Sequence, residues 1–256
     1  MMKKRGQLTI FILIAIMIIA IIILFFLLRN KSPITLTGGN EESPESFLQN
    51  CIKDKFSKGV DLISSQGGYV SNTLNIGYDD KKVSYLCYST LNYQKCINQE
   101  PVLITHLETE IKNYLSVEIS SCWDKLTLGM QEKGYTVNVK KYNYTGVKLT
   151  PGKAIIELKN AEIRLTKTEE SLKYNKFRLN FNTKLYDLAV VVQEIVSQEA
   201  KFCNFENLGY MMIHPETKIT EKTFRDETTI YIVEDRKTKE QFFFAVRSCA
   251  IPGGIG

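Results

Sequence analysis

The sequence predicts an α+β fold in which an N-terminal transmembrane helix precedes an extracytoplasmic domain of antiparallel sheet, about three helices and disulfide bonds. Three observations lead to this class. Residues 8–28 form one uninterrupted apolar run, the later apolar periodicity changes between helix and strand in blocks, and all six cysteines follow the run. The strand-like segments mostly succeed one another, which favours an antiparallel sheet over alternating α/β units.

The apolar run predicts a membrane span. It has 21 residues without a charge, and Thr9 is its only polar member. As a helix it would be about 31 Å long, close to the hydrocarbon thickness of a bilayer. The apolar part of a cleaved signal peptide is shorter, about 7–15 residues, and precedes a small-residue cleavage site, which this run lacks. We therefore expect residues 7–28 to remain as an anchor in the lipid bilayer.

The flanking residues predict the topology. Lys3, Lys4 and Arg5 precede the run, and such basic clusters stay on the cytoplasmic side. Residues 1–6 are then cytoplasmic, residues 29–43 form a flexible linker, and residues 44–256 form one extracytoplasmic domain. The later apolar segment at residues 188–196 is too short to span and contains two polar residues. The expectation is a single-pass signal-anchor protein of the cell membrane.

Three helices are expected in the domain. Ser43 and Pro44 suit the N-cap and first position of a helix that ends at Gln66-Gly67-Gly68. Thr105 and Glu108 fit a capping box that would open the second helix. Residues 185–202 predict the third. The apolar stripes at three- and four-residue spacing comprise Leu48, Ile52, Phe56, Val60 and Ile63; Leu107, Ile111, Leu115, Ile119, Cys122 and Leu126; and Leu188, Val192, Ile195 and Val196.

Strands are expected elsewhere. Residues 83–88, 229–233 and 241–247 are rich in β-branched and aromatic residues, and within residues 135–183 apolar and polar residues alternate. Turn signals occur at Pro151-Gly152 and Asn160. The continuous run Phe242-Phe243-Phe244 predicts a strand buried on both faces rather than an adhesive surface patch.

The cysteines predict disulfides. An even number in an extracytoplasmic domain is typical of a disulfide framework, although six cysteines allow 15 pairings. The short segment between Cys87 and Cys96 favours that pair, which leaves Cys51–Cys122 and Cys203–Cys249 as plausible partners. Free buried thiols are the main alternative. A zinc or thioredoxin-like site is disfavoured because the chain has no C-x2-C spacing and its two histidines are far apart.

No residue is predicted to be catalytic, to bind a cofactor or to ligate a metal. His106 is expected on a helix surface and His214 in a turn, and Asp79-Asp80-Lys81-Lys82 is expected to be a solvated turn rather than a cation site. None of the usual nucleotide, hydrolase or calcium motifs occurs. The net charge of +5 comes mostly from the N-terminal cluster, so nucleic-acid binding is not expected. Asn143 and Asn30 begin glycosylation sequons, and Asn143 is the better candidate.

The N-terminus resembles a type IV pilin-like (class III) signal of archaeal surface proteins. The resemblance rests on Lys3-Lys4-Arg5-Gly6-Gln7 followed by Leu8-Thr9-Ile10-Phe11. It implies peptidase cleavage between Gly6 and Gln7. The sequence departs from that family at Phe11, where an acidic residue is usual, and at Pro33 and Gly38-Gly39, which interrupt the helix that pilins continue into the head.

Three short segments resemble a wider group of uncharacterised single-pass archaeal cell-surface proteins. They are the Gly-Gln-x-Thr-Ile-Phe start, Gln66-Gly67-Gly68-Tyr69 and the closing Phe244-Ala245-Val246-Arg247. The resemblance implies a cell-surface setting and no activity.

These observations lead to a functional expectation. We expect a non-enzymatic membrane-anchored cell-surface protein with a structural, adhesive or envelope-assembly role, in contact with the bilayer and with other surface proteins. The first alternative is a pilin-like filament subunit processed after Gly6. The second is an extracytoplasmic hydrolase whose site is too dispersed to recognise.

Overall fold

A computed structural model describes residues 17–19 and 43–251. The chain divides into two compact units, residues 1–41 and residues 42–256. In the first unit the described residues form one turn of α-helix. Within the described residues, no helix has the length and apolar character needed to cross a bilayer. Apart from residues 17–19, the expected span lies outside the described residues. The same holds for the processing residues Gly6 and Gln7, for the sequon at Asn30 and for the linker before Ser43.

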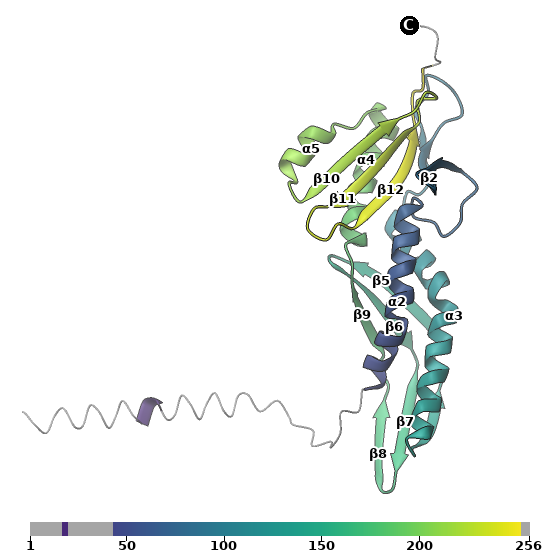
Figure 1. The fold of residues 1–256 in the computed structure, drawn as a ribbon, viewed down its shortest axis with the longest axis vertical. Coiled ribbons are helices and arrows are strands. Elements are labelled where there is room, and N and C mark those ends of the chain that lie inside the picture. The colour runs from purple at the N-terminus through teal and green to yellow at the C-terminus, as the bar shows by residue number, and fades with distance from the viewer. Residues whose placement is uncertain (1–16, 20–42, 252–256) are drawn as a thin grey trace, which may run out of the picture. The chain divides into compact units, whose positions relative to one another are not determined.

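The second unit is an α+β domain with three sheets (Figure 1). Its elements, in chain order, are α2 (Pro44–Ser65), β1 (Asn75–Tyr78), β2 (Lys81–Tyr88), β3 (Ile97–Asn98), α3 (Leu103–Glu132), β4 (Thr136–Lys140), β5 (Tyr144–Thr150), β6 (Lys153–Lys159), β7 (Glu162–Lys167), β8 (Glu170–Tyr174), β9 (Arg178–Asn182), α4 (Leu185–Phe202), α5 (Asn207–Ile213), β10 (Thr217–Thr223), β11 (Thr229–Asp235) and β12 (Gln241–Arg247).

The largest sheet has six strands in the order β1-β2-β12-β11-β10, with the short β3 beside β2. Its pairs are antiparallel except β12 and β2, which run parallel. The expectation of an antiparallel sheet is therefore correct for all pairs but this one. The exception arises because β2 and β12 are separated by most of the domain, and a long connection allows parallel pairing. Two three-stranded antiparallel sheets, β4-β7-β8 and β5-β6-β9, complete the domain.

Helices α2 and α3 lie side by side and connect the sheets (Figure 1). Helix α2 packs on β9 and also on β12, and α3 packs on β4 and β5, so the two helices share a hydrophobic core with all three sheets. The helices approach closely at Gly59, where an added Cβ would lie 2.6 Å from the ring of Tyr114. A larger residue at this position would force the Tyr114 ring or α3 itself to shift, which favours glycine there.

The first and third expected helices are confirmed. Helix α2 begins at Pro44, and the Ser43 side chain accepts a hydrogen bond from the Ser46 N–H at 3.1 Å. After α2, Gly67 adopts a φ of 71°, the left-handed conformation that glycine supplies after a helix. Helix α4 spans the expected residues and buries the expected stripe. Phe242, Phe243 and Phe244 are all buried, as expected for the core.

The capping box at the second helix is wrong. Helix α3 begins at Leu103 after Val102, and no side chain caps its N-terminus. Glu108 instead accepts the N–H of Leu149 on β5 at 2.9 Å and pairs with Lys148 at 3.4 Å. The carboxylate of Glu108 therefore binds residues of β5 and not the N-terminus of the helix. Six elements were not named from the sequence: β1, β3, β5, β8, α5 and β10.

Candidate functional site

All six cysteines form disulfides in the described domain. Cys51 pairs with Cys122, Cys87 with Cys96, and Cys203 with Cys249, which are the three pairs named from the sequence. The first joins α2 to α3, and the third joins the end of α4 to the segment after β12. Cys51 and Cys122 also lie near Glu118, a grouping with metal-ligand proximity. Their sulfurs are bonded to each other and so offer no thiolate to a metal.

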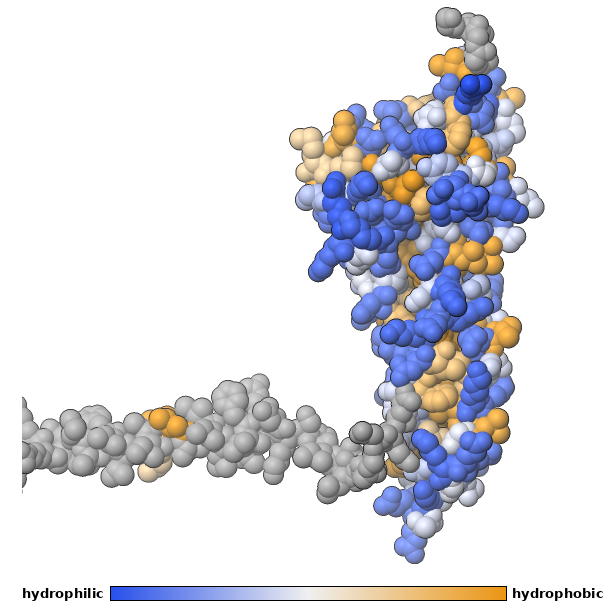
Figure 2. Space-filling view, viewed as in Figure 1, coloured by the Kyte–Doolittle hydropathy of each residue, from blue (hydrophilic) through white to orange (hydrophobic). Residues whose placement is uncertain are grey.

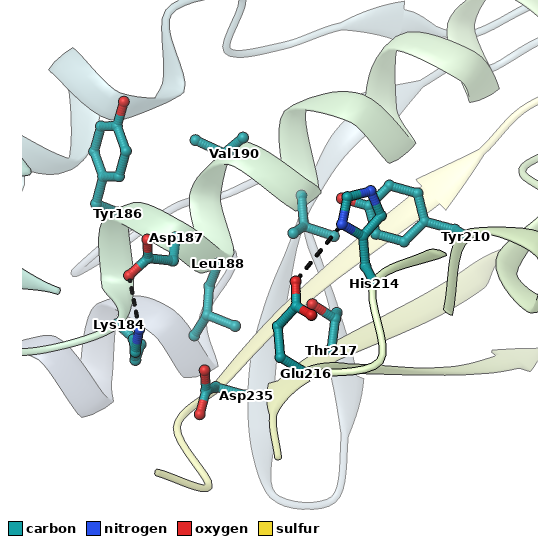
Figure 3. A pocket seen from close by; sticks show the side chains of 11 residues that line it. Lys184, Tyr186, Asp187, Leu188, Val190, Tyr210, His214, Glu216, Thr217 and Asp235 are labelled. Carbon is teal, nitrogen blue, oxygen red and sulfur yellow. Dashed lines mark ion pairs between the residues drawn. The ribbon is translucent and has the colours of Figure 1, made fainter. Parts of the chain in front are cut away.

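A recess of about 510 Å³ lies where α4, α5, β10 and β11 meet (Figure 3). Both apolar and polar side chains line it. The residues that line it are Lys184, Tyr186, Asp187, Leu188, Val190, Val191, Tyr210, His214, Glu216, Thr217 and Asp235.

Two ion pairs face each other across this recess (Figure 3). Lys184 Nζ lies 3.4 Å from Asp187 Oδ2, which also accepts the N–H of Gly152 at 3.0 Å. His214 Nδ1 lies 3.6 Å from Glu216 Oε1. The side chains of His214 and Glu216 are 43% and 63% exposed, so water screens this pair strongly.

Two further polar residues of the recess, Asp235 and Tyr210, make local contacts. Burial by itself would raise the pKa of Asp235, but hydrogen bonds from Thr238 and from the N–H of Lys237 outweigh burial and lower it. Burial raises the pKa of Tyr210, whose ring stacks on that of His214 with centroids 4.3 Å apart. His214 is thus held at the end of α5, in the turn expected from the sequence. The recess thus brings one imidazole, one ammonium group and three carboxylates together at a surface open to water.

His106 belongs to a second polar cluster, near the start of α3. Its Nε2 donates to the carbonyl of Gly68 at 3.0 Å, and its Nδ1 lies 3.6 Å from Glu100 Oε1. Tyr69 donates its hydroxyl to the same carboxylate, and Glu110 accepts the N–H of Val70 at 2.7 Å. Burial and the hydrogen bond to Glu100 raise the pKa of Tyr69.

This cluster fastens the loop after α2 to α3. The side chain of His106 is only 17% exposed, so the expectation of a surface helix residue is wrong. The histidine faces the preceding loop, a neighbour that helical periodicity cannot reveal. Every polar atom named here has a structural partner, which gives the cluster a role in loop positioning.

A third buried polar pair lies in the core. Glu199 on α4 is 6% exposed and accepts a hydrogen bond from the hydroxyl of Tyr231 on β11. Burial raises the pKa of Glu199, and the hydrogen bond from Tyr231 partly opposes this effect. Burial, together with the neighbouring carboxylate of Glu199, also raises the pKa of Tyr231. The carboxyl group therefore favours its neutral form more than an exposed glutamate does.

The other sequence candidates lie on the surface. Asp79 and Asp80 form the two-residue turn between β1 and β2, both with positive φ, and Lys81 pairs with Asp79 at 3.4 Å. This is the solvated turn expected there. Asn143 is exposed just before β5, and its side-chain oxygen accepts a hydrogen bond from Asn160.

Helix α5, which the sequence pattern missed, borders the recess and exposes apolar side chains. Leu208, Met212 and Ile213 are largely exposed, and none of its residues is buried. Figure 2 shows hydrophobic surface at this position, whereas most of the visible face is hydrophilic. The signal that could have indicated α5 is the apolar cluster Tyr210-Met211-Met212-Ile213, which is too short to show a helical period.

No protein-family model, curated protein or solved structure matches this chain.

Proposed function

We propose that this chain is a non-enzymatic, single-pass membrane-anchored protein whose disulfide-bonded domain lies outside the cytoplasm, with a structural, adhesive or envelope-assembly role. The observation that carries the proposal is the pairing of all six cysteines. Disulfides persist in oxidising compartments and are rare in the cytosol. The uncharged apolar run at residues 8–28 supplies the anchor, and the basic residues before it favour a cytoplasmic N-terminus.

The geometry of the polar clusters supports a binding or structural role over catalysis. The His106 cluster is fully engaged in holding a loop, and the His214–Glu216 pair is exposed to water at the rim of its recess. A catalytic acid or base is usually held in a cleft that is shielded from water. The recess remains the place where an extracytoplasmic hydrolase, the second alternative, would have to act.

The start of α2 favours a simple anchor over a pilin-like filament subunit. A pilin-like subunit continues its apolar helix directly into the head. Here Ser43 is extended, with φ −62° and ψ 151°, and Pro44 opens a new, separately capped helix. A residue that precedes proline avoids the helical region, so a continuous helix cannot pass this point.

The intact mass of the chain from native membranes tests the proposal. Alkylation without reduction should label none of the cysteines, and the matched sample reduced first should take up six labels. Six labels without reduction would overturn the extracytoplasmic assignment. The same spectrum reads the N-terminus: a chain that begins at Met1 supports a simple anchor, and one that begins at Gln7 supports the pilin-like pathway.

Protease added to intact cells tests the topology separately. Cleavage should remove the mass beyond the apolar run, while a cytoplasmic marker protein stays intact until the cells are permeabilised. Full protection of the domain in intact cells would refute the proposed orientation.

A further inference from the structure

The charges of the domain are distributed very unevenly along the chain. Residues 43–251 carry 28 basic and 26 acidic residues, a net charge of only +2. Residues 133–182, which form β4 to β9, carry 11 basic and four acidic residues, a net charge of +7. The rest of the domain therefore has a net charge of −5. All 11 basic side chains of the β4–β9 segment are exposed.

Part of this charge lies on one face of the β5-β6-β9 sheet. Ala154, Ile156 and Leu158 on β6 are buried against the core, so the residues between them point to the opposite face, where Ile155 is buried and Lys153 and Lys159 are exposed. The strand register places further exposed basic residues on that same face. We define the basic face by Lys148, Lys153, Lys159, Lys176 and Arg178.

Two shallow depressions mark the basic face. They have volumes of about 410 Å³ and 350 Å³ and share Glu157, Lys159 and Arg178 in their linings. Glu157 is the only carboxylate in either lining, and it is paired with Arg178 at 3.5 Å. The other lining residues include Lys176, Asn160 and Asn175 in one depression, and Lys148 and Tyr144 in the other.

The positive charge of this face is largely uncompensated. Within residues 43–251, Lys153, Lys159 and Lys176 form no ion pair, while Lys148 pairs with Glu108. The ammonium group of Lys159 lies 5.5 Å from the ring centroid of Tyr144. Lysine ammonium groups beside amide donors are suited to phosphate oxygens, which accept several hydrogen bonds at once.

The basic face belongs to the sheet at which the chain enters the domain. The N–H of Arg178 on β9 donates to Glu45 at 3.2 Å, and the N–H of Asn180 donates to Gln49 at 3.4 Å. Glu45 and Gln49 lie in the first turns of α2. Only residues 29–43 separate this helix from the apolar run. A linker of that length has a root-mean-square span of about 20 Å and a maximum reach of about 50 Å.

We propose that the basic face binds the anionic phosphate headgroups of the bilayer in which the chain's own apolar run is anchored. This inference rests on the proposed membrane anchorage. The linker keeps the face at a high effective concentration near the headgroups, so weak individual contacts suffice for docking. Each lysine near an anionic membrane surface strengthens binding by about five-fold at moderate salt. In this arrangement the β5-β6-β9 sheet contacts the membrane, and the recess at α4 and α5 lies outside the contacting segment.

Lysine acetylation of the full chain in lipid nanodiscs tests the proposal. Discs of phosphatidylcholine alone are compared with discs that also contain phosphatidylglycerol, and the acetylation rate of each lysine is read by peptide mass spectrometry. Lys148, Lys153, Lys159 and Lys176 should react at least about five-fold more slowly in the anionic discs. Lys218, Lys222 and Lys237, which are exposed outside the β4–β9 segment, should react equally in both. About 1 M salt should abolish the difference, because it shortens the screening length to about 3 Å.

Equal rates in the two kinds of disc would overturn the proposal. Soluble polyphosphate added to neutral discs tests whether the face binds a soluble polyanion instead of anionic lipid. If polyphosphate protects the face and anionic lipid does not, the membrane is the wrong partner. Insertion of the chain into the discs is read independently by co-elution at alkaline pH. If the chain fails to insert, the anchor is refuted, and flotation of the chain with phosphatidylglycerol vesicles then decides whether the face binds lipid.

Charge-neutral variants provide the second measurement. Lys148→Gln, Lys159→Gln and Lys176→Gln together should remove the protection of Lys153 in anionic discs. The matched control, Lys218→Gln, Lys222→Gln and Lys237→Gln, removes the same charge and should leave that protection unchanged. Equal loss in both variants would show a net-charge effect and would overturn the assignment to this face.

Discussion

The disulfide between Cys51 and Cys122 should contribute more to stability than the other two. It joins residues 71 positions apart, whereas Cys87 and Cys96 are nine positions apart. A crosslink reduces the entropy of the unfolded chain by an amount that grows with the logarithm of the loop. This relation gives about 4.4 kcal/mol for the longer loop and about 2.7 kcal/mol for the shorter one.

The perturbation is the replacement of both cysteines of a pair by alanine, which leaves no lone thiol. Helices α2 and α3 remain packed along their length without the crosslink, so the effect acts mainly through the unfolded state. For a domain of this size each kcal/mol changes the melting temperature by about 2–4 °C. Removal of Cys51–Cys122 should therefore lower Tm by about 9–18 °C, and removal of Cys87–Cys96 by about 5–11 °C.

Differential scanning calorimetry of the full chain in detergent micelles measures both variants and the wild type. The variant that lacks Cys203 and Cys249, which are 46 positions apart, should fall between them at about 4 kcal/mol. In the presence of reductant all the chains should melt at nearly the same temperature, since none then retains a crosslink. A larger loss of Tm for the Cys87–Cys96 variant than for the Cys51–Cys122 variant would refute the loop-length reasoning.

Three further substitutions test the core, the turns and the buried acid. Because burial raises the pKa of Glu199 in the folded state, the folded chain binds its proton more tightly than the unfolded chain, and stability should fall as pH rises from about 4.3 through the raised pKa. Glu199→Gln should therefore match the wild type near pH 4 and exceed its Tm near pH 8. Gly67→Ala should lower the free energy of unfolding by more than about 1 kcal/mol, because φ is 71° and the new Cβ would lie 2.9 Å from a backbone oxygen. Phe244→Ala should cost about 3–5 kcal/mol in chemical denaturation, because the ring is fully buried and stacks on Tyr231.

Two of these predictions carry an internal check. Gly129→Ala is the partner of the Gly67 variant: Gly129 lies inside α3 with open space around it, so alanine should stabilise the helix by about 1 kcal/mol. A stable Gly67→Ala protein would show that the turn after α2 tolerates a side chain. For Glu199→Gln, a Tm difference from the wild type that is the same at both pH values would mean that the carboxyl group does not titrate differently on folding.

The sequence predicted elements whose signals are local. Ser43 and Pro44 open α2 because a hydroxyl cap and a fixed proline φ act on the neighbouring backbone alone. Residues 185–202 are helical as expected because one apolar face repeats through five turns. By contrast, β10 carries a single buried apolar residue, Ile219, and α5 is only seven residues long. Such elements exist because neighbouring strands and helices complete them.

The candidate sites also divide into those with a local signal in the sequence and those that depend on tertiary contacts. The sequence could favour the pair Cys87–Cys96, because only a short loop separates these two cysteines. The other four cysteines still allow three connectivities, and the structure decides between them. The environment of His106 could not be predicted from the sequence. Its partners Gly68 and Glu100 lie on loops whose positions depend on the packing of α2 against α3. The recess at His214 likewise needs residues from four separate elements.

By itself, therefore, the sequence determined the α+β class, the three long helices and most strands, since hydrophobic period, caps and turns act over a few residues. Only the tertiary structure decided the parallel pairing of β12 with β2, the loss of the Thr105–Glu108 cap, and the single face on which Lys148, Lys159 and Arg178 meet. These features depend on strand register and on contacts between residues far apart in the chain. A local sequence pattern does not specify which distant residue a side chain or strand will contact.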